Sequence, residues 1–246
     1  MELGRVALVT GGSRGIGKAI AKTLTQRGYR VAINYNRTQP SESFALAVKC
    51  DIADPAQAKS LVGEVESKLG PVEVLVNNAG KLVLGDLFDM NQDEFEAMRK
   101  INVDGLSSVT RAAAEGMKAR KWGRIVNISS IAAHATSVPG TTFYAATKAA
   151  VNLLTRRFAY ELGPFGITVN AIAPGFIMTD MVTDGRTPAQ VDEIRERMAS
   201  NAMMRRIGKP EDIAHAVAFV VSDEASFLTA QVLTVDGGRM DYIIHP

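Results

Sequence analysis

The feature of this sequence that most restricts its fold is a regular alternation between short runs of β-branched residues and longer helical patterns. Such alternation is typical of βαβ units, in which parallel strands form one sheet and helices cover both of its faces. We therefore expect one α/β domain over residues 1–246, with a doubly wound, Rossmann-type parallel sheet. The expected strands are 5–10, 30–35, 45–50, 72–76, 123–128, 167–173 and 231–235, and the expected helices are 17–27, 55–69, 92–118, 144–162, 188–199 and 210–221.

Two segments depart from this alternation. Residues 36–44 (NRTQPSESF) are short and irregular, so we expect the crossover helix there to be truncated or missing. Residues 180–202 begin irregularly, with Asp184, Gly185 and Pro188, before their helical part. Long segments of this kind within a domain are more often functional than idle, so we expect a substrate lid at 180–202, with a plain surface excursion as the alternative.

Charge and composition exclude several functions. The 28 Lys and Arg nearly balance the 26 Asp and Glu, for a net charge of +2, which does not indicate nucleic-acid binding. Cys50 is the single cysteine, and His134, His215 and His245 have no ligand spacing, so we expect neither a disulfide nor a metal site. The N-terminus lacks the pattern of a signal peptide, and no apolar stretch approaches the ~20 residues of a membrane span. We expect a soluble cytoplasmic protein.

The first expected strand runs directly into a glycine-rich turn, residues 10–17 (TGGSRGIG), and a helical pattern follows. Glycines at Gly11, Gly15 and Gly17 let the backbone turn tightly and approach a pyrophosphate, and the helix N-terminus offers unpaired N–H groups to it. The spacing G-x-x-x-G-x-G differs from the G-x-G-x-x-G fingerprint. A glycine-rich connection without a ligand is the alternative, but the position between strand and helix favours a dinucleotide site.

The end of the second expected strand indicates which dinucleotide binds. An acid there would accept hydrogen bonds from a ribose 2′-hydroxyl, whereas this strand ends in Tyr35, Asn36 and Arg37. A carboxylate would repel a 2′-phosphate, but Arg37 and Arg14 could pair with one. These residues favour NADP(H) over NAD(H), although Arg37 could also be a solvated loop cation.

Tyr144 and Lys148 open a helical pattern four residues apart, so they share one helix face. A free tyrosine has a pKa of about 10. The Lys148 cation and an oxidised nicotinamide would favour the phenolate and lower that pKa, so Tyr144 could serve as acid or base near neutral pH. Packing is the default interpretation of such a pair taken alone.

Three other segments make chemistry the better interpretation. Ser129 and Ser130 end the fifth expected strand, at the sheet edge where ligands bind in open α/β folds. Residues 77–80 (NNAG) form a turn after the fourth strand that would bring backbone against a cofactor. Asn102 lies inside a helical pattern, an unusual place for Asn unless its side chain or a local kink has a function.

Together these residues resemble the short-chain dehydrogenase/reductase family over essentially the whole chain. The resemblance rests on segments 11–17 and 77–80, on Asp51 and Ile52, on Asn102, Ser130, Tyr144 and Lys148, and on Pro174, Gly175 and Thr179. It implies a sheet of about seven strands, a homotetramer, and a catalytic tetrad of Asn102, Ser130, Tyr144 and Lys148.

The resemblance also implies a role for each site residue. Tyr144 would donate a proton to a substrate carbonyl, Ser130 would stabilise its oxygen, and Lys148 would bind ribose hydroxyls. Asn102 would hold a water that links Lys148 to solvent. Asp51 and Ile52 would contact adenine, and Thr179 the nicotinamide carboxamide. The expected cofactor-binding residues are Gly11, Ser13, Arg14, Gly15, Ile16, Gly17, Asn36, Arg37, Asp51, Ile52, Asn77, Ala79, Gly80, Tyr144, Lys148, Pro174, Gly175, Ile177 and Thr179.

Within the family the chain is most similar to 3-oxoacyl-acyl-carrier-protein reductases, through segments 166–170, 174–181, 206–213 and 235–238. This similarity implies reduction of a 3-oxoacyl thioester carried by acyl carrier protein. A sugar, steroid or polyol dehydrogenase of the same fold is one alternative, and a non-catalytic NADP(H)-binding sensor or scaffold is another.

Three features depart from that subgroup. The spacing from Ser130 to Tyr144 is one residue longer than usual, and we assign the extra residue to loop 132–142. Phe165 stands where a basic residue often meets the carrier protein, and residues 239–246 extend past the usual end. Lys118, Arg120 and Lys121 could still form a carrier-docking patch, and a solvated helix end is the alternative.

Overall fold

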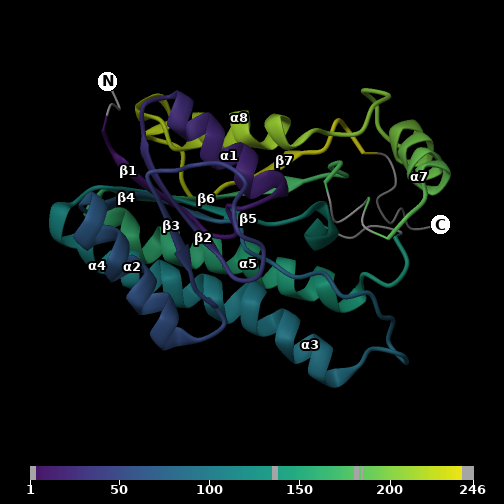
Figure 1. Cartoon of the computed structure of the whole chain (residues 1–246), viewed down its shortest axis with the longest axis horizontal. Helices are drawn as coiled ribbons and strands as arrows, with labels where there is room; N and C mark the ends of the chain where they lie inside the picture. Colours follow the sequence, from purple (N-terminus) through teal and green to yellow (C-terminus); the bar gives the residue numbers. More distant parts are fainter. Residues whose placement is uncertain (1–3, 135–137, 180–182, 184, 240–246) are drawn as a thin grey trace.

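The computed structural model of the chain describes residues 4–134, 138–179, 183 and 185–239. Its centre is a sheet of seven parallel strands in the order β3-β2-β1-β4-β5-β6-β7 (Figure 1). The order reverses between β1 and β4, which creates the crevice where open α/β sheets bind ligands. The strands are β1 (Val6–Val9), β2 (Arg30–Tyr35), β3 (Leu46–Lys49), β4 (Val72–Asn77), β5 (Gly123–Ile128), β6 (Ile167–Pro174) and β7 (Val232–Val235).

Helices cover both faces of the sheet. Helices α1 and α8 pack on one face, and α2, α4 and α5 pack on the other, while α7 projects to one side (Figure 1). The α-helices of the described residues are α1 (Gly15–Gln26), α2 (Pro55–Leu69), α3 (Gln92–Arg99), α4 (Leu106–Arg120), α5 (Thr142–Leu162), α7 (Pro188–Ser200) and α8 (Pro210–Val220). Among the residues that the structure describes, no helix is both long and apolar enough to cross a bilayer.

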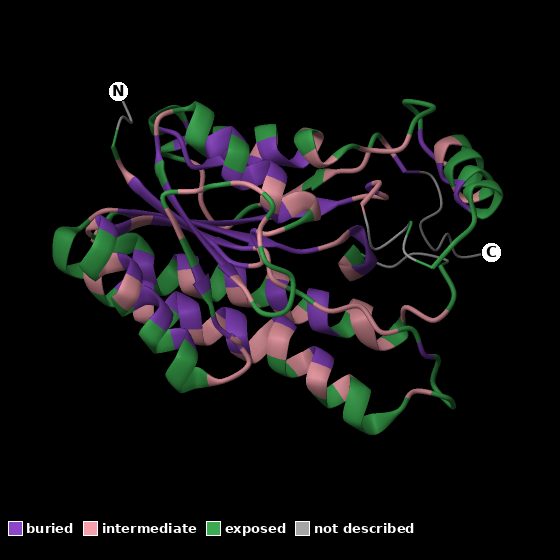
Figure 2. Cartoon of the chain, viewed as in Figure 1, coloured by how far each residue is buried: buried purple, intermediate pink, exposed green. Residues whose placement is uncertain are grey.

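The buried residues form two cores, one on each face of the sheet (Figure 2). Successive residues of a strand point to opposite faces, so Ile125 of β5 joins the core beneath α2, α4 and α5, and Val126 joins the core beneath α1 and α8. All six residues of β5 are buried. This double burial explains why the strands are continuous apolar runs rather than alternating ones.

The expected strands and their parallel arrangement are confirmed, with ends that differ by at most a few residues. Residues 36–45 contain no helix, as their composition predicts. The helix expected at 92–118 is confirmed as continuous helical structure over residues 92–120, in which a π-helical turn η1 (Lys100–Gly105) separates α3 from α4. Of the lid expected at 180–202, the structure describes α7, while residues 180–182 and 184 lie outside the described residues.

Lys121 ends α4 in the left-handed conformation, with φ of 55°. This conformation costs a residue with a Cβ atom about 1–2 kcal/mol, and part of that cost is offset because a side chain also restricts the unfolded chain.

We therefore predict that Lys121→Gly raises the free energy of unfolding by about 0.5–1 kcal/mol, since glycine adopts this conformation readily. Urea denaturation of the wild type, Lys121→Gly and the charge control Lys121→Ala would measure it. A glycine variant no more stable than the alanine variant would contradict the assignment of strain.

Candidate active site

The turns that follow β1, β4, β5 and β6 meet at the carboxyl edge of the sheet. Two glycines allow the first two of these turns to touch. A Cβ atom on Gly17 would lie 2.3 Å from Nδ2 of Asn78, and one on Gly11 would lie 2.9 Å from Cα of Ala79. Real Cβ atoms do not approach other atoms so closely, so neither position accepts a side chain without movement. The glycine pattern therefore serves close packing between the turns as well as ligand access.

Hydrogen bonds fix the contact between these two turns. The Thr10 hydroxyl oxygen accepts from the N–H groups of Asn78 and Ala79, at 3.0 and 3.1 Å. The Asn78 amide donates to the main-chain oxygens of Thr10 and Gly11, both at 3.0 Å. Thr10 and Asn78 thus hold the two turns together, a role that the sequence patterns do not predict.

Asn34 connects the same turn to the next two strands. Its Oδ1 accepts from the N–H of Gly11 at 3.3 Å, and its Nδ2 donates to the main-chain oxygen of Cys50 at 2.8 Å. Asn34 is 2% exposed, so both bonds are shielded from water. The ends of β1, β2 and β3 are therefore held together at the place where a dinucleotide would cross them.

The N-terminus of α1 fits a pyrophosphate. Asp54, Asn91 and Thr187 cap helices α2, α3 and α7 with their side chains, whereas no side chain caps α1. No acidic residue lies in the first turn of α1 either. The N-terminal N–H groups and the positive end of the helix dipole are therefore available to an anion.

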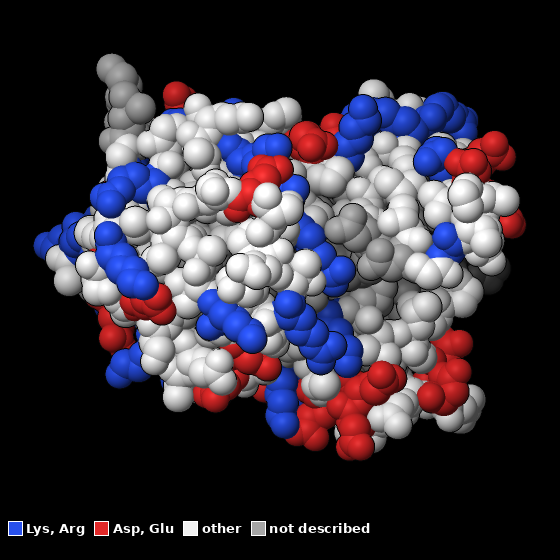
Figure 3. Space-filling view, in the orientation of Figure 1, with Lys and Arg blue, Asp and Glu red and all other residues white. Residues whose placement is uncertain are grey.

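The adenosine end of the expected site lies near the ends of β2 and β3. Asn36 and Arg37 after β2 are exposed, as is Arg14 in the glycine-rich turn. Lys and Arg atoms spread across the middle of this face (Figure 3). Asp51 accepts a hydrogen bond from the N–H of Ala53 at 3.0 Å, and Ile52 is buried. The structure therefore places the cations expected to meet a 2′-phosphate in solvent, where a ligand could reach them.

Two expected cofactor residues have internal contacts. The Asn77 amide is buried and donates to Oγ1 of Thr110 and Oδ1 of Asn127, both at 2.9 Å, so its side chain faces the protein interior. Ile177 is 7% exposed and packs in the core beneath α1 and α8. A cofactor could therefore meet little of either side chain.

The segment after β6 reaches back to the glycine-rich turn. The N–H of Gly175 donates to the main-chain oxygen of Val235 at 3.0 Å, which fixes the end of the strand at Pro174. Cγ2 of Thr179 lies 3.5 Å from the position of a Cβ atom on Gly15. Thr179 is thus close to the N-terminus of α1, where the family resemblance places the cofactor.

Ser130, Tyr144 and Lys148 come together at the ends of β5 and α5. The Ser130 hydroxyl lies close enough to the Tyr144 phenol to lower its pKa. The Lys148 ammonium is buried, donates to the main-chain oxygen of Ile128 at 2.8 Å, and lies 5.8 Å from the centre of the Tyr144 ring. The three expected catalytic groups are therefore neighbours, as their positions in the sequence predict.

The expectation that Lys148 lowers the pKa of Tyr144 is wrong for the protein without a cofactor. Burial of the phenol raises the pKa of Tyr144, and the hydrogen bond from Ser130 opposes this only partly. Burial also lowers the pKa of Lys148, from 10.5 to about 8. Desolvation is therefore the largest influence on the pKa of both groups. The Lys148 ammonium is held by the main-chain oxygen of Ile128.

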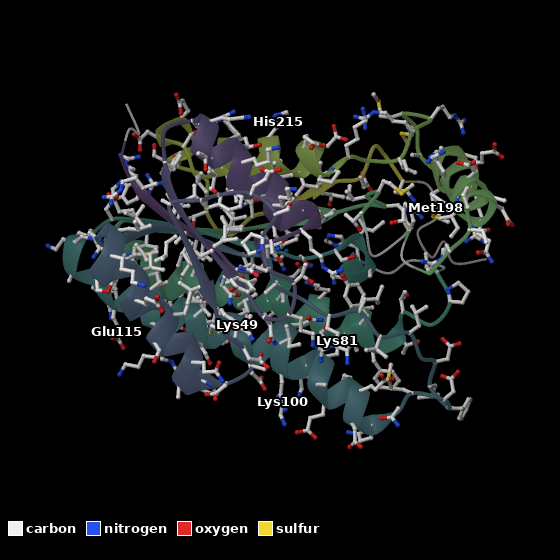
Figure 4. All side chains as sticks on the ribbon, viewed as in Figure 1. Lys49, Lys81, Lys100, Glu115, Met198 and His215 are labelled. Atoms are coloured by element: carbon white, nitrogen blue, oxygen red, sulfur yellow. The ribbon has the colours of Figure 1, made fainter. Side chains whose placement is uncertain are left out.

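Asn102 occupies the π-helical turn between α3 and α4, which accounts for its unusual place in a helical pattern. Its Oδ1 accepts from the N–H of Lys81 at 2.8 Å, and its Nδ2 donates to the main-chain oxygen of Lys81 at 2.9 Å and to Oγ1 of Thr147 at 3.0 Å. The side chain thus clamps the chain after Gly80 against α5. Lys81 is labelled in Figure 4. Both amide hydrogens of Asn102 are used in this clamp, so they are not available to hold the expected water.

The two serines after β5 have different environments. Ser129 is 3% exposed, and its hydroxyl donates to Oδ1 of Asn152 at 2.6 Å. Ser130 is partly exposed, lies beside the Tyr144 phenol, and accepts from the N–H of Ala132 at 3.1 Å. Ser130 is therefore the serine that a substrate could reach. Asn152 was not predicted, because its partner is far away in the sequence.

Comparisons with known proteins agree with this geometry. A family model described as Enoyl-(Acyl carrier protein) reductase matches residues 11–239. The chain is 39% identical to 3-oxoacyl-(acyl-carrier-protein) reductase FabG of Staphylococcus aureus, over 97% of this chain and 99% of that protein. It is 40% identical to acetoacetyl-CoA reductase of Shinella zoogloeoides, over 96% of this chain and 99% of that protein.

Two solved structures are also similar. Ligand-free aldohexose dehydrogenase of Thermoplasma acidophilum has a TM-score of 0.90 and 33% identity, and the match covers 96% of this chain and 94% of that one. A blue fluorescent protein from a metagenomic library, in complex with NADPH, has a TM-score of 0.85 and 36% identity, with 96% and 98% covered.

The buried ammonium of Lys148 generates a prediction about stability. Because the folded pKa is depressed to about 8, the charged form costs stability below that pH, and the cost falls away as the pH rises toward the ordinary value of 10.5. Lys148→Met removes the charge and nearly preserves the volume. We predict that it raises the free energy of unfolding at pH 7 by about 1–3 kcal/mol, after the loss of the bond to Ile128.

Urea denaturation between pH 7 and 10 would test this prediction. The advantage of the Lys148→Met variant should shrink above pH 8 as the wild type loses its buried charge. Lys100→Met, at an exposed lysine paired with Glu96, should change stability little and serves as the control. A Lys148→Met variant less stable than the wild type at pH 7 would show that the ammonium stabilises the fold.

Proposed function

Because the chain belongs to the short-chain dehydrogenase/reductase family and is an oxidoreductase acting on CH–OH or C=O groups, we propose that it is an NADPH-dependent reductase of 3-oxoacyl thioesters. The observation that carries the proposal is the contact of Ser130 with Tyr144 beside the buried Lys148. The proposed product is the 3-hydroxyacyl thioester, with acyl carrier protein as the proposed carrier.

The state of Tyr144 suits a reductase. Reduction of a carbonyl requires a proton for the developing alkoxide, and a raised pKa keeps the phenol of Tyr144 protonated at neutral pH. Ser130 donates to the same substrate oxygen and stabilises its charge in the transition state. NADPH supplies the hydride when it is bound.

The other residues of the site position these groups. Lys148 would exchange its bond to Ile128 for the ribose hydroxyls of the cofactor, which are additional acceptors for a poorly solvated ammonium. Asn102 holds the segment after Gly80 against α5 and so shapes the wall beside Lys148. We propose that segment 180–202, which includes α7, covers the substrate.

Names of relatives support the thioester over other carbonyls. Two full-length relatives, at 39% and 40% identity, are named as reductases of 3-oxoacyl-(acyl-carrier-protein) and acetoacetyl-CoA. An aldohexose dehydrogenase has the same fold at 33% identity, so a sugar is the second candidate substrate. A non-catalytic sensor is the third candidate, and it would not require the contact between Ser130 and Tyr144.

The carrier patch expected at the end of α4 is only partly available. Lys118 lies over the ring of Phe165, 4.5 Å from its centre, and Arg120 donates to the main-chain oxygen of Val72 at 2.7 Å. All three cations are exposed, and Lys121 is the one of them for which the described residues show no such contact. Coenzyme A thioesters are therefore proposed substrates beside carrier-bound ones. The proposed assembly is a homotetramer.

Steady-state rates with NADPH test the proposed function. Acetoacetyl-CoA and an acetoacetyl carrier protein should be reduced with kcat/KM at least about a hundredfold above that for glucose or other aldohexoses, tested in the oxidative direction with NADP⁺. Faster turnover of the sugars would support the second candidate. No turnover of any carbonyl or alcohol would support the sensor.

Cofactor preference is a separate prediction. NADPH should be used with a higher kcat/KM than NADH, because Arg14 and Arg37 are exposed near the ends of β1 and β2 and no acid follows β2. Arg37→Ala and Arg14→Ala should each reduce this ratio, by about tenfold for a lost charge-assisted bond. Equal use of both cofactors by the wild type, or an unchanged ratio in both variants, would refute the preference.

The serine assignment gives another prediction. Ser130→Ala should lower kcat by about a hundredfold, as for other lost oxyanion donors, with nearly unchanged NADPH affinity. Ser129→Ala should lower kcat far less, since its hydroxyl faces Asn152. Both are measured with the thioester that the wild type reduces. If Ser129→Ala were the less active variant, the tetrad would have to be redrawn around Ser129.

A further inference from the structure

Helix α5 carries four hydrogen-bonding side chains along one face. Tyr144, Lys148, Asn152 and Thr155 are spaced four, four and three residues apart, which places them on a single stripe of the helix. The stripe faces the last residues of β5 and the two residues after them. The sequence analysis used only the first two members, and the proposed mechanism leaves Asn152 and Thr155 without a function.

The two ends of the stripe set its alignment with the strand. At the far end, Asn127 of β5 donates to Oγ1 of Thr155 at 2.9 Å. At the near end, the Ser130 hydroxyl lies beside the Tyr144 phenol and lowers its pKa. Positions along β5 therefore rise as positions along α5 fall, so the helix runs antiparallel to the strand. Any movement of α5 along β5 would break these contacts.

Ser129 makes the contact between these two ends. Its N–H donates to the main-chain oxygen of Ile172 at 2.7 Å, so β6 holds its backbone. Its hydroxyl donates to Oδ1 of Asn152 at 2.6 Å and lies 3.3 Å from the main-chain oxygen of Lys148. A residue fixed in the sheet therefore holds α5 one turn beyond Lys148.

The neighbouring residue Ile128 completes the connection, since its main-chain oxygen accepts from the Lys148 ammonium at 2.8 Å. If the Lys148 ammonium instead bound the ribose hydroxyls of a cofactor, that bond would be lost. The contacts of the Ser129 hydroxyl with Oδ1 of Asn152 and with the main-chain oxygen of Lys148 would then still join the end of the strand to the helix.

We propose that Ser129 and Asn152 are positioning residues, whose hydrogen bond holds α5 along β5 so that Tyr144 stays within reach of Ser130 while Lys148 changes partner. The inference rests on the proposed function for its catalytic consequences. Displacement of reacting groups by about 1 Å can lower the rate about a hundredfold. Partial loosening of α5 should therefore lower kcat about tenfold.

Loosening should also change the titration of Tyr144. The bond from Ser130 opposes the effect of burial on the pKa of Tyr144, and Lys148 is the charged group that the structure places beside the ring. If α5 shifts, Tyr144 loses part of the Ser130 bond, and its pKa rises further. The pH dependence of kcat should move to higher pH in parallel.

The experiment compares Ser129→Ala, Asn152→Ala and the double variant with the wild type. Ser129→Thr, which keeps the hydroxyl, is the rescue variant. Thr155→Val is the matched control, because it breaks the same kind of bond between β5 and α5 farther from Tyr144. The measurements are kcat, KM and their pH profiles, the Tm, and the ultraviolet titration of tyrosinate. Subtraction of a Tyr144→Phe spectrum in each background isolates Tyr144.

We expect each alanine variant to lower kcat about tenfold and to raise the pH at which Tyr144 titrates. The double variant should be no worse than the more affected single variant, because one bond is lost in all three. Ser129→Thr should recover most of the activity, and Thr155→Val should lower the Tm without moving either pH dependence.

The proposal is overturned if the alanine variants titrate and turn over as the wild type does, if their effects on kcat multiply in the double variant, or if Thr155→Val moves the pH dependence equally. The tyrosinate titration needs no substrate. It therefore decides the positioning role even if the wild type reduces no carbonyl, a result that would refute the proposed function instead.

Discussion

The close approach of two turns, one after β1 and one after β4, determines where the rest of the site can lie. Thr10 and Asn78 join these turns by four hydrogen bonds, and Gly11 and Gly17 leave the space in which they meet. The approach aims the uncapped N-terminus of α1 at the crevice where the strand order reverses. It also sends the chain after β4 past Lys148, where Asn102 holds it. The place for an anion and the wall of the catalytic site thus depend on one contact.

Desolvation is the second general influence on the site. Tyr144 and Lys148 are close together, yet burial raises the pKa of the phenol and lowers that of the ammonium. Each pKa shift favours the neutral form of its group. Without a cofactor, Tyr144 and Lys148 are therefore less readily ionised than they would be in water. A cofactor with ribose hydroxyls and, when oxidised, a cationic ring would change this balance. On the proposed function, the site would become fully catalytic only with its cofactor in place, and Tyr144 would hold the proton needed for reduction.

Much of the fold could be predicted from local patterns. Runs such as 123–128 are apolar because both faces of the sheet are covered, and the glycines of 11–17 mark the turn into α1. What could not be predicted depends on partners far away in the sequence. Asn102 lies in a π-helical turn and bonds to Lys81, and Asn152 looks like an ordinary helix residue until α5 packs on β5. The direction of the Tyr144 pKa shift was wrong for the same reason, since burial is a property of the whole fold.

The central claim is that Tyr144 donates the proton in reduction while other groups bind the cofactor. The most direct test measures NADPH affinity by fluorescence and kcat with acetoacetyl-CoA for the wild type and Tyr144→Phe. The account predicts an NADPH Kd within a few-fold of the wild type, and a kcat lower by about 10²–10⁴, the usual contribution of a positioned acid. A Tyr144→Phe enzyme that binds NADPH and keeps kcat within about tenfold of the wild type would contradict it.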